Sequence, residues 1–127
     1  MLGLILRVVG SVVLLLWGLI HLVPIRSILH GFGRIPTESR RIFIMTWVNE
    51  GLSLCFVGAL VGLITYYGIL GRAFENTLVL AASGYLLATA AVSLFTGARN
   101  PSVWLKLCPV VKILVAGLFI ITAAGVV

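Results

Sequence analysis

The stretch IFIMTWVNEGLSLCFVGALVGLITY, residues 42–66, decides the fold class of this chain. Its length suits a membrane-spanning helix, because a hydrocarbon core of about 30 Å takes about 20 apolar residues. Its apolar residues are continuous rather than alternating, so the strands of a membrane β-barrel are not expected. One carboxylate, Glu50, nevertheless lies inside the stretch, although the chain has only three acidic residues. The stretch therefore predicts a membrane helix that carries an unusual polar residue.

Three further apolar runs accompany this one, at residues 2–24, 75–95 and 103–127. The chain of 127 residues is 61% hydrophobic and 9% charged, whereas about 25% of the residues in a soluble domain are charged. We therefore expect an all-α membrane protein, a single domain of residues 1–127 folded as an antiparallel bundle of four transmembrane helices. The connections leave no room for a soluble catalytic domain, so any chemistry is expected in or at the membrane.

The basic residues predict the orientation of the helices. The linker IRSILHGFGRIPTESRR, residues 25–41, contains four arginines, and Arg99 and Lys106 flank the last connection on the same side. Positive residues favour the cytoplasmic side, so both termini are expected outside, in the periplasm of a bacterial inner membrane. The linker mixes apolar and basic residues, which is typical of a segment lying on a membrane surface. It is expected to bind anionic lipid headgroups through Arg26, Arg34, Arg40 and Arg41.

The net charge of +6 also raises the possibility of a nucleic-acid partner. The basic residues lie at helix ends and not on one soluble face, so we expect no such partner. Cys55 and Cys108 form no C-x-x-C pair, and their spacing predicts neither a thiol relay nor a zinc site. No metal site and no catalytic residue are predicted.

Polar residues of the second run recur with a helical spacing. Four of them fall at i, i+3, i+4 and i+7 and share one face, which we expect to avoid lipid: Thr46, Asn49, Glu50 and Ser53. The first run carries a comparable stripe of small and polar residues, with Trp17 at its edge: Arg7, Gly10, Ser11, Leu14, Gly18 and His21. The two stripes could face each other. Arg7 is expected to pair with Glu75.

Glu50 is costly inside a bilayer and predicts a functional site with a nearby partner. The helical rise places it about 14 Å beyond Arg41, close to the middle of the membrane. Because side chains lean toward the N-terminus of their helix, Glu50, His21 and Lys112 are expected at a similar level. The predicted partner of Glu50 is therefore His21 or Lys112, although Lys112 could instead extend to its nearer interface.

A structural role for Glu50 stays open beside the functional one. The carboxyl group could bond to Asn49, Ser53 or a neighbouring helix and only hold the helices in register. His21 could likewise be a packing residue. The predicted polar site comprises six residues: Glu50, His21, Lys112, Asn49, Ser53 and Trp17.

The plan of the chain resembles the DoxX-like superfamily of small four-helix membrane proteins. The first helix opens with an arginine, in ILRVVGSVVLLLWGLIHL, and the second has an early carboxylate and glycine, in WVNEGLSLCFVGALVG. The residues that carry the resemblance are Arg7, Gly10, His21, Glu50 and Gly51. The linker GFGRIPTESRR is longer than the family's usual first connection. The resemblance implies a small subunit associated with membrane oxidoreductase assemblies and quinone-linked sulfur chemistry.

Two functions are compatible with these features. The first is an accessory subunit or scaffold that packs against a larger membrane complex or forms a homo-oligomer. The second is a module that binds a quinone or lipid beside His21 and Glu50, since an imidazole and a carboxylate suit proton transfer. A transporter is less well supported, because the chain has one polar cluster and no evident broken helix. Quinone is the one cofactor that the second function implies.

Overall fold

A computed structural model of the chain describes residues 1–126. Within these residues the backbone forms helices and no strand. The elements follow one another as α1 (Leu2–His21), α2 (Ile25–Gly31), α3 (Thr37–Tyr67), α4 (Arg72–Phe95), the 3₁₀ turn η1 (Gly97–Arg99) and α5 (Val103–Ala123). The predicted all-α class is confirmed for this part of the chain.

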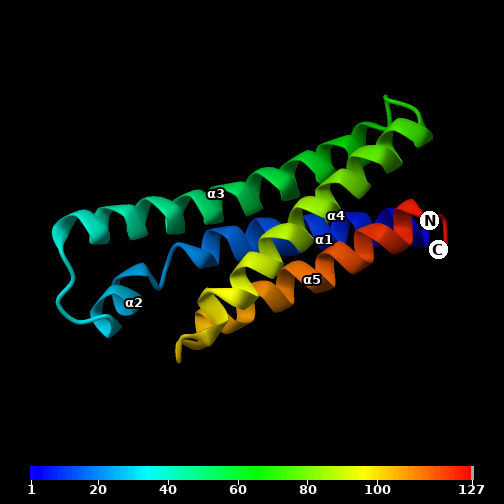
Figure 1. The fold of residues 1–127 in the computed structure, drawn as a ribbon. Helices are drawn as coiled ribbons and strands as arrows, with labels where there is room; N and C mark the ends of the chain where they lie inside the picture. The colour runs from blue at the N-terminus through cyan, green and yellow to red at the C-terminus, as the bar shows by residue number, and fades with distance from the viewer. Residues whose placement is uncertain (127) are drawn as a thin grey trace.

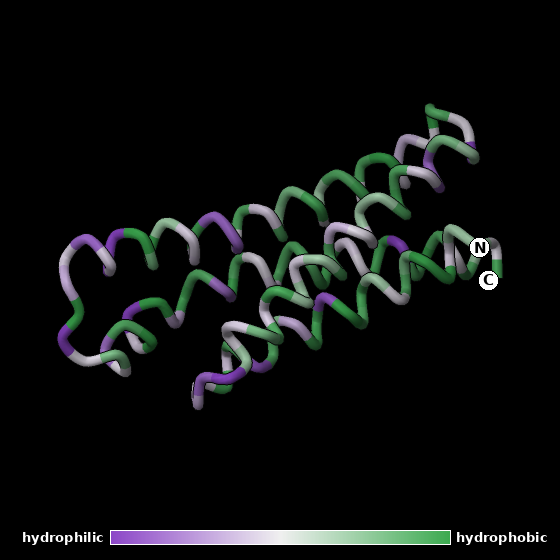
Figure 2. The backbone as a smooth tube through the Cα atoms, viewed as in Figure 1, coloured by the Kyte–Doolittle hydropathy of each residue, from purple (hydrophilic) through white to green (hydrophobic). Residues whose placement is uncertain are grey.

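Four of the described helices are long and apolar enough to cross a membrane: α1, α3, α4 with η1, and α5. Figure 2 shows hydrophobic residues along most of their length, with isolated hydrophilic positions between them. Figure 1 shows the four helices lying side by side, with both termini at one end and α2 and η1 at the other. The short α2 is thus far from the chain ends.

The two helix boundaries that flank the first connection differ from the predicted ones. α1 ends at His21, and Pro24 directly precedes α2. α3 begins at Thr37 and not near residue 42. Pro36 has an extended backbone directly before the helix, and the carboxylate of Glu38 in the first turn interacts favourably with the positive end of the helix dipole. The predicted surface linker is therefore divided between α2, a short connection and the first turn of α3. The predicted ends were the ends of apolar runs, and a helix can begin or end at a residue outside or inside such a run.

The fourth predicted run also differs in length. α5 ends at Ala123, and the predicted end at Val127 lies outside the described residues. α4 begins at Arg72, three residues before the predicted start, after Gly71 with φ 78°. That backbone conformation favours glycine, so the sequence GR, rather than the first carboxylate, marks the helix start.

The helices associate as two pairs. α1 packs extensively on α3 and α4 packs extensively on α5, while a contact between α1 and α5 joins the two pairs. α3 and α4 touch only over a small area. The interface between α3 and α4 is consequently the loosely packed side of the assembly.

Glycines set the close contact between α1 and α3. A Cβ added to Gly18 would lie 2.7 Å from the carbonyl oxygen of Gly51, and one added to Gly58 would lie 2.7 Å from that of Ser11. The predicted small and polar stripe of α1 is indeed its buried face, comprising Gly10, Ser11, Leu14, Gly18 and His21. Ser11, Leu14 and Gly18 of this stripe face the glycine side of α3, however, and not the predicted polar side, while Gly10 faces Phe119 of α5.

Candidate functional site

The centre of the assembly contains an ion pair between α5 and α3. Lys112 has no exposed side-chain surface and pairs with the carboxylate of Glu50, whose side chain is 29% exposed. The Lys112 ammonium also donates to the hydroxyl of Ser93 on α4, at 3.1 Å. Of the two predicted partners of Glu50, Lys112 is thus the one in contact, and the alternative in which Lys112 extends to an interface is wrong. A buried ammonium needs an anionic partner, and Glu50 supplies it. Together with the bond to Ser93, the Lys112 ammonium connects α5 with α3 and α4.

His21 lies beside this pair at the end of α1. Its imidazole stacks on the indole of Trp47, with ring centroids 4.1 Å apart and planes 10° apart. The Trp47 indole N–H donates to the backbone oxygen of His21 at 2.6 Å. The buried Nε2 of His21 has no hydrogen-bond partner among the described residues. Trp47, which sequence reasoning missed, therefore fixes the ring of His21 and leaves one of its nitrogens available.

A cavity of about 210 Å³ joins these groups. Its lining includes His21, Trp47, Glu50, Ser93 and Cys108. Trp47 and Glu50 are one helical turn apart on α3, and this spacing was the available sequence signal for Trp47. The cavity occurs where α3 and α4 make little contact, so Glu50 keeps part of its surface open.

An apolar groove continues along the same two helices. It has a volume of about 480 Å³ and is lined on α3 and α4 by Leu52, Ser53, Phe56, Val57, Leu60, Leu78, Ala81, Ala82 and Tyr85. On α3 its residues directly follow those of the polar cavity. A polar cavity and an apolar groove thus succeed each other along the loose interface.

The predicted polar face of α3 is not buried as a unit. Asn49 and Thr46 are exposed, and Ser53 is half-buried in the lining of the groove. The Thr46 hydroxyl donates to Phe43 of its own helix at 2.9 Å. The expectation that this face avoids the outside is wrong for Asn49. Gly51 packs against α1, and a residue two positions away on a helix lies on nearly the opposite side.

Trp17, another residue of the predicted polar site, lies apart from the cavity. Trp17 is half-buried, with its ring centroid 6.5 Å from that of Trp104, and it does not line the cavity beside Glu50.

The predicted pair between Arg7 and Glu75 is absent from the described residues. Arg7 donates instead to the side chain of Asn76 and to Thr122. The rotation of α4 about its axis directs Asn76, the residue after Glu75, toward Arg7.

Three of the four predicted headgroup-binding arginines share a cavity of about 790 Å³ at the α2 end. Arg26, Arg34 and Arg40 line it together with His30. Arg41 is exposed but is not part of the lining. The fold of α2 back toward the start of α3 brings these cations together.

The side chains that line the cavity beside Glu50 offer hydrogen-bonding groups. Among residues 1–126, no group of three His, Cys, Asp or Glu side chains could hold a metal ion. The partly open carboxylate of Glu50 can accept hydrogen bonds, and the free ring nitrogen of His21 can accept or donate one according to its tautomer. These groups suit the polar head of a molecule whose apolar part occupies the groove.

Comparisons of the chain with protein-family models, curated proteins and solved structures found no match. The resemblance to the DoxX-like superfamily stays a prediction from the sequence.

Proposed function

We propose that this chain is an integral membrane protein that binds an amphipathic molecule of the quinone or lipid class between α3 and α4. Its four long helices would cross the bilayer as an antiparallel bundle. The observation that supports this proposal best is the buried Nε2 of His21, which lacks a hydrogen-bond partner among the described residues and lines the same cavity as Glu50. Buried polar atoms are nearly always hydrogen-bonded, so a ligand would complete this site.

The shape of the opening favours an amphipathic ligand. The polar cavity of about 210 Å³ and the apolar groove of about 480 Å³ together have the size of an ordinary small-molecule site. Both lie at the loose α3–α4 interface, where a molecule can enter sideways from the lipid. The head would meet Glu50 and His21, and the tail would lie against Phe56 and Ala81.

The ion pair gives each polar group a separate role. Lys112 holds the carboxylate of Glu50 in place and, being fully buried, does not itself face the ligand. Glu50 would accept a hydrogen bond from a ligand hydroxyl. His21 would bond to a carbonyl or hydroxyl through Nε2. In a quinone these two groups would also be positioned to exchange protons with the head.

The membrane setting completes the proposal. We place the termini in the periplasm of a bacterial inner membrane and the α2 end in the cytoplasm, where Arg26, Arg34 and Arg40 would bind anionic lipid headgroups. Membership of the DoxX-like superfamily agrees with this arrangement, and it is part of the same proposal.

Filling the groove should weaken ligand binding without changing the ion pair. We expect Ala81→Phe to weaken the binding of a short-chain ubiquinone at least tenfold, because Ala81 lines the groove and a phenyl ring would occupy the tail's place. The readout is quenching of tryptophan fluorescence, since Trp47 lines the head cavity. The matched control is Ala73→Phe on the same helix, which is exposed, outside the linings of groove and cavity, and turned about 80° away from Ala81. Equal affinities for the two variants, or no binding by the wild type of either quinone or co-extracted lipid, would contradict the proposal.

A second candidate function, an accessory subunit of a larger membrane complex, is favoured by the outer face of α4. Thr77, Gly84, Ala88 and Ala91 are all exposed. A Cβ added to Gly84 would meet no atom within 4 Å, so packing within the chain does not require glycine there. Small residues on a lipid-facing helix allow another helix to approach closely.

Enlarging Gly84 should separate the two functions. We expect Gly84→Leu to remove the chain from its complex while leaving its stability and quinone affinity unchanged, because the site has open space. The measurement is native mass spectrometry of protein gently extracted from its own membrane. Gly117→Leu on α5, where an added Cβ also meets nothing within 4 Å, is the control. A monomeric wild type, or equal association of both variants, would exclude the subunit role for this face.

A further inference from the structure

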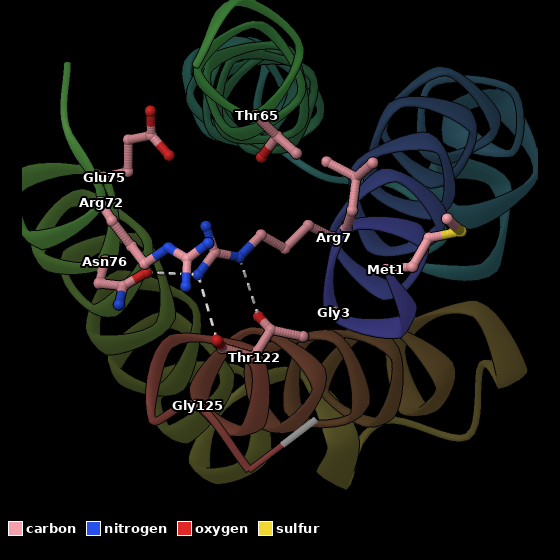
Figure 3. Close-up of a pocket in the computed structure, with 10 residues that line it drawn as sticks. Met1, Gly3, Arg7, Thr65, Arg72, Glu75, Asn76, Thr122 and Gly125 are labelled. Atoms are coloured by element: carbon pink, nitrogen blue, oxygen red, sulfur yellow. Dashed lines mark hydrogen bonds between the residues drawn. The ribbon is translucent and has the colours of Figure 1, made fainter. Parts of the chain in front are cut away.

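Another polar cavity lies at the opposite end of the helices from α2. It has a volume of about 280 Å³ and is bordered by α1, α3, α4 and α5. Its polar lining comprises Arg7, Thr65, Arg72, Glu75, Asn76 and Thr122 (Figure 3). Neither function proposed above uses these residues.

Arg7 is held firmly and still has free donors. Its Nε donates to the hydroxyl of Thr122 at 3.2 Å, and its Nη2 donates to the Thr122 carbonyl at 3.2 Å and to the side chain of Asn76. An arginine has five N–H groups. No partner for the Nη1 nitrogen occurs within residues 1–126. The guanidinium is therefore pre-oriented, with one nitrogen left over.

Two further groups point into the cavity. Thr65 is only 7% exposed, and its hydroxyl has no hydrogen-bond partner among the described residues. Figure 3 shows this hydroxyl directed toward the space that the arginine side chains enter. Arg72 is exposed at its surface but lines the same cavity. A buried hydroxyl without a partner is unfavourable, and a ligand with acceptor oxygens would satisfy it.

The charge of the cavity favours an anion. Among residues 1–126, two guanidinium groups face one side-chain carboxylate, that of Glu75. The N-terminus of α4 also lies here, since Arg72, Glu75 and Asn76 belong to its first turns, and no side chain caps it. The free N–H groups and positive dipole of a helix N-terminus attract anions. These contributions add to those of the arginines.

We propose that this cavity binds a phosphoryl group through Arg7, Arg72 and the hydroxyl of Thr65. A phosphate has several oxygens in different directions, which suits donors arriving from three helices, and guanidinium groups match its geometry well. The source is either a phospholipid headgroup or free phosphate. The first source rests on the membrane-spanning arrangement proposed above, because it requires this end to lie at headgroup level. The second does not depend on that arrangement.

Arg72 offers the cleanest test, because Arg7 also holds three helices together. In an uncharged detergent we expect inorganic phosphate, measured by calorimetry, or phosphatidylglycerol, measured by native mass spectrometry, to bind the wild type. Arg72→Gln should weaken this binding at least tenfold, and Thr65→Val about fivefold. Glu75→Gln should strengthen it, since it removes the negative charge that Glu75 contributes to the lining. A purely structural role for these residues would not predict that gain.

The control is Arg99→Gln, which removes the same charge from an exposed residue at the other end of the helices. It should leave the affinity unchanged. Binding of phosphate alone identifies a small-anion site, and binding of phosphatidylglycerol but not phosphatidylcholine identifies a headgroup site; either result, with the loss in Arg72→Gln, supports the proposal. Failure of both probes to bind, or equal losses in Arg72→Gln and Arg99→Gln, overturns it. None of these outcomes depends on quinone binding at the cavity lined by His21 and Glu50.

Discussion

Replacing Glu50 by leucine is expected to destabilise the folded chain by about 3–5 kcal/mol, the usual cost of leaving one member of a buried ion pair alone. The reason is Lys112, which has no exposed side-chain surface. Without Glu50, its ammonium would retain only the hydroxyl of Ser93, at 3.1 Å. The measurement is the free energy of unfolding in mixed micelles with increasing fractions of denaturing detergent.

The opposite substitution should cost less. Lys112→Met leaves Glu50, whose side chain is 29% exposed and can be neutralised or solvated more easily. The double variant Glu50→Leu with Lys112→Met should recover most of the lost stability, because neither charge remains. The interaction free energy from this cycle isolates the pair. A stability of Glu50→Leu within about 1 kcal/mol of the wild type would show that Lys112 is not held as a buried cation.

The double variant also distinguishes the two roles of Glu50. If the carboxylate only holds the helices in register, restoring stability should restore quinone binding. If Glu50 contacts the ligand head, the double variant should be stable and bind weakly. Stability and binding are therefore measured on the same protein.

Helical geometry was sufficient to predict which residues share a level, but not which of them touch. The rise per residue and the lean of the side chains placed Glu50, His21 and Lys112 together in depth. Choosing Lys112 as the partner required the lateral order of the helices. That order depends on which glycine faces meet, and the sequence offers several: Gly10, Gly18, Gly51, Gly58, Gly62 and Gly84.

Two of the wrong expectations share one physical cause, the rotation of a helix about its own axis. Asn49 is exposed because Gly51, on nearly the opposite side of α3, is the residue that contacts α1. Arg7 bonds to Asn76 rather than to its neighbour Glu75, although both are polar. Neighbouring residues on a helix point about 100° apart, so charge patterns alone do not select between them.

Replacing Gly58 by alanine is expected to destabilise the α1–α3 contact by about 1–3 kcal/mol, the typical cost of overpacking. The added Cβ would lie 2.7 Å from the carbonyl oxygen of Ser11 and 3.0 Å from the Cβ of Leu14. The closer of these atoms is backbone, so the two helices would have to separate. The loss should appear in the same unfolding measurement, even though alanine favours a helix over glycine by about 1 kcal/mol.

Gly62→Ala is the matched control, because both glycines belong to one G-x-x-x-G pattern that treats them alike. A Cβ at Gly62 would have its nearest neighbour, the Cβ of Ser11, at 3.5 Å, which is ordinary contact. This variant should therefore be neutral or more stable by up to about 1 kcal/mol. Similar losses in both variants would mean that the two glycines approach α1 equally. A harmless Gly58→Ala would mean that the helices are further apart, and the rotation of α3 that directs Glu50 toward Lys112 would lose its physical basis.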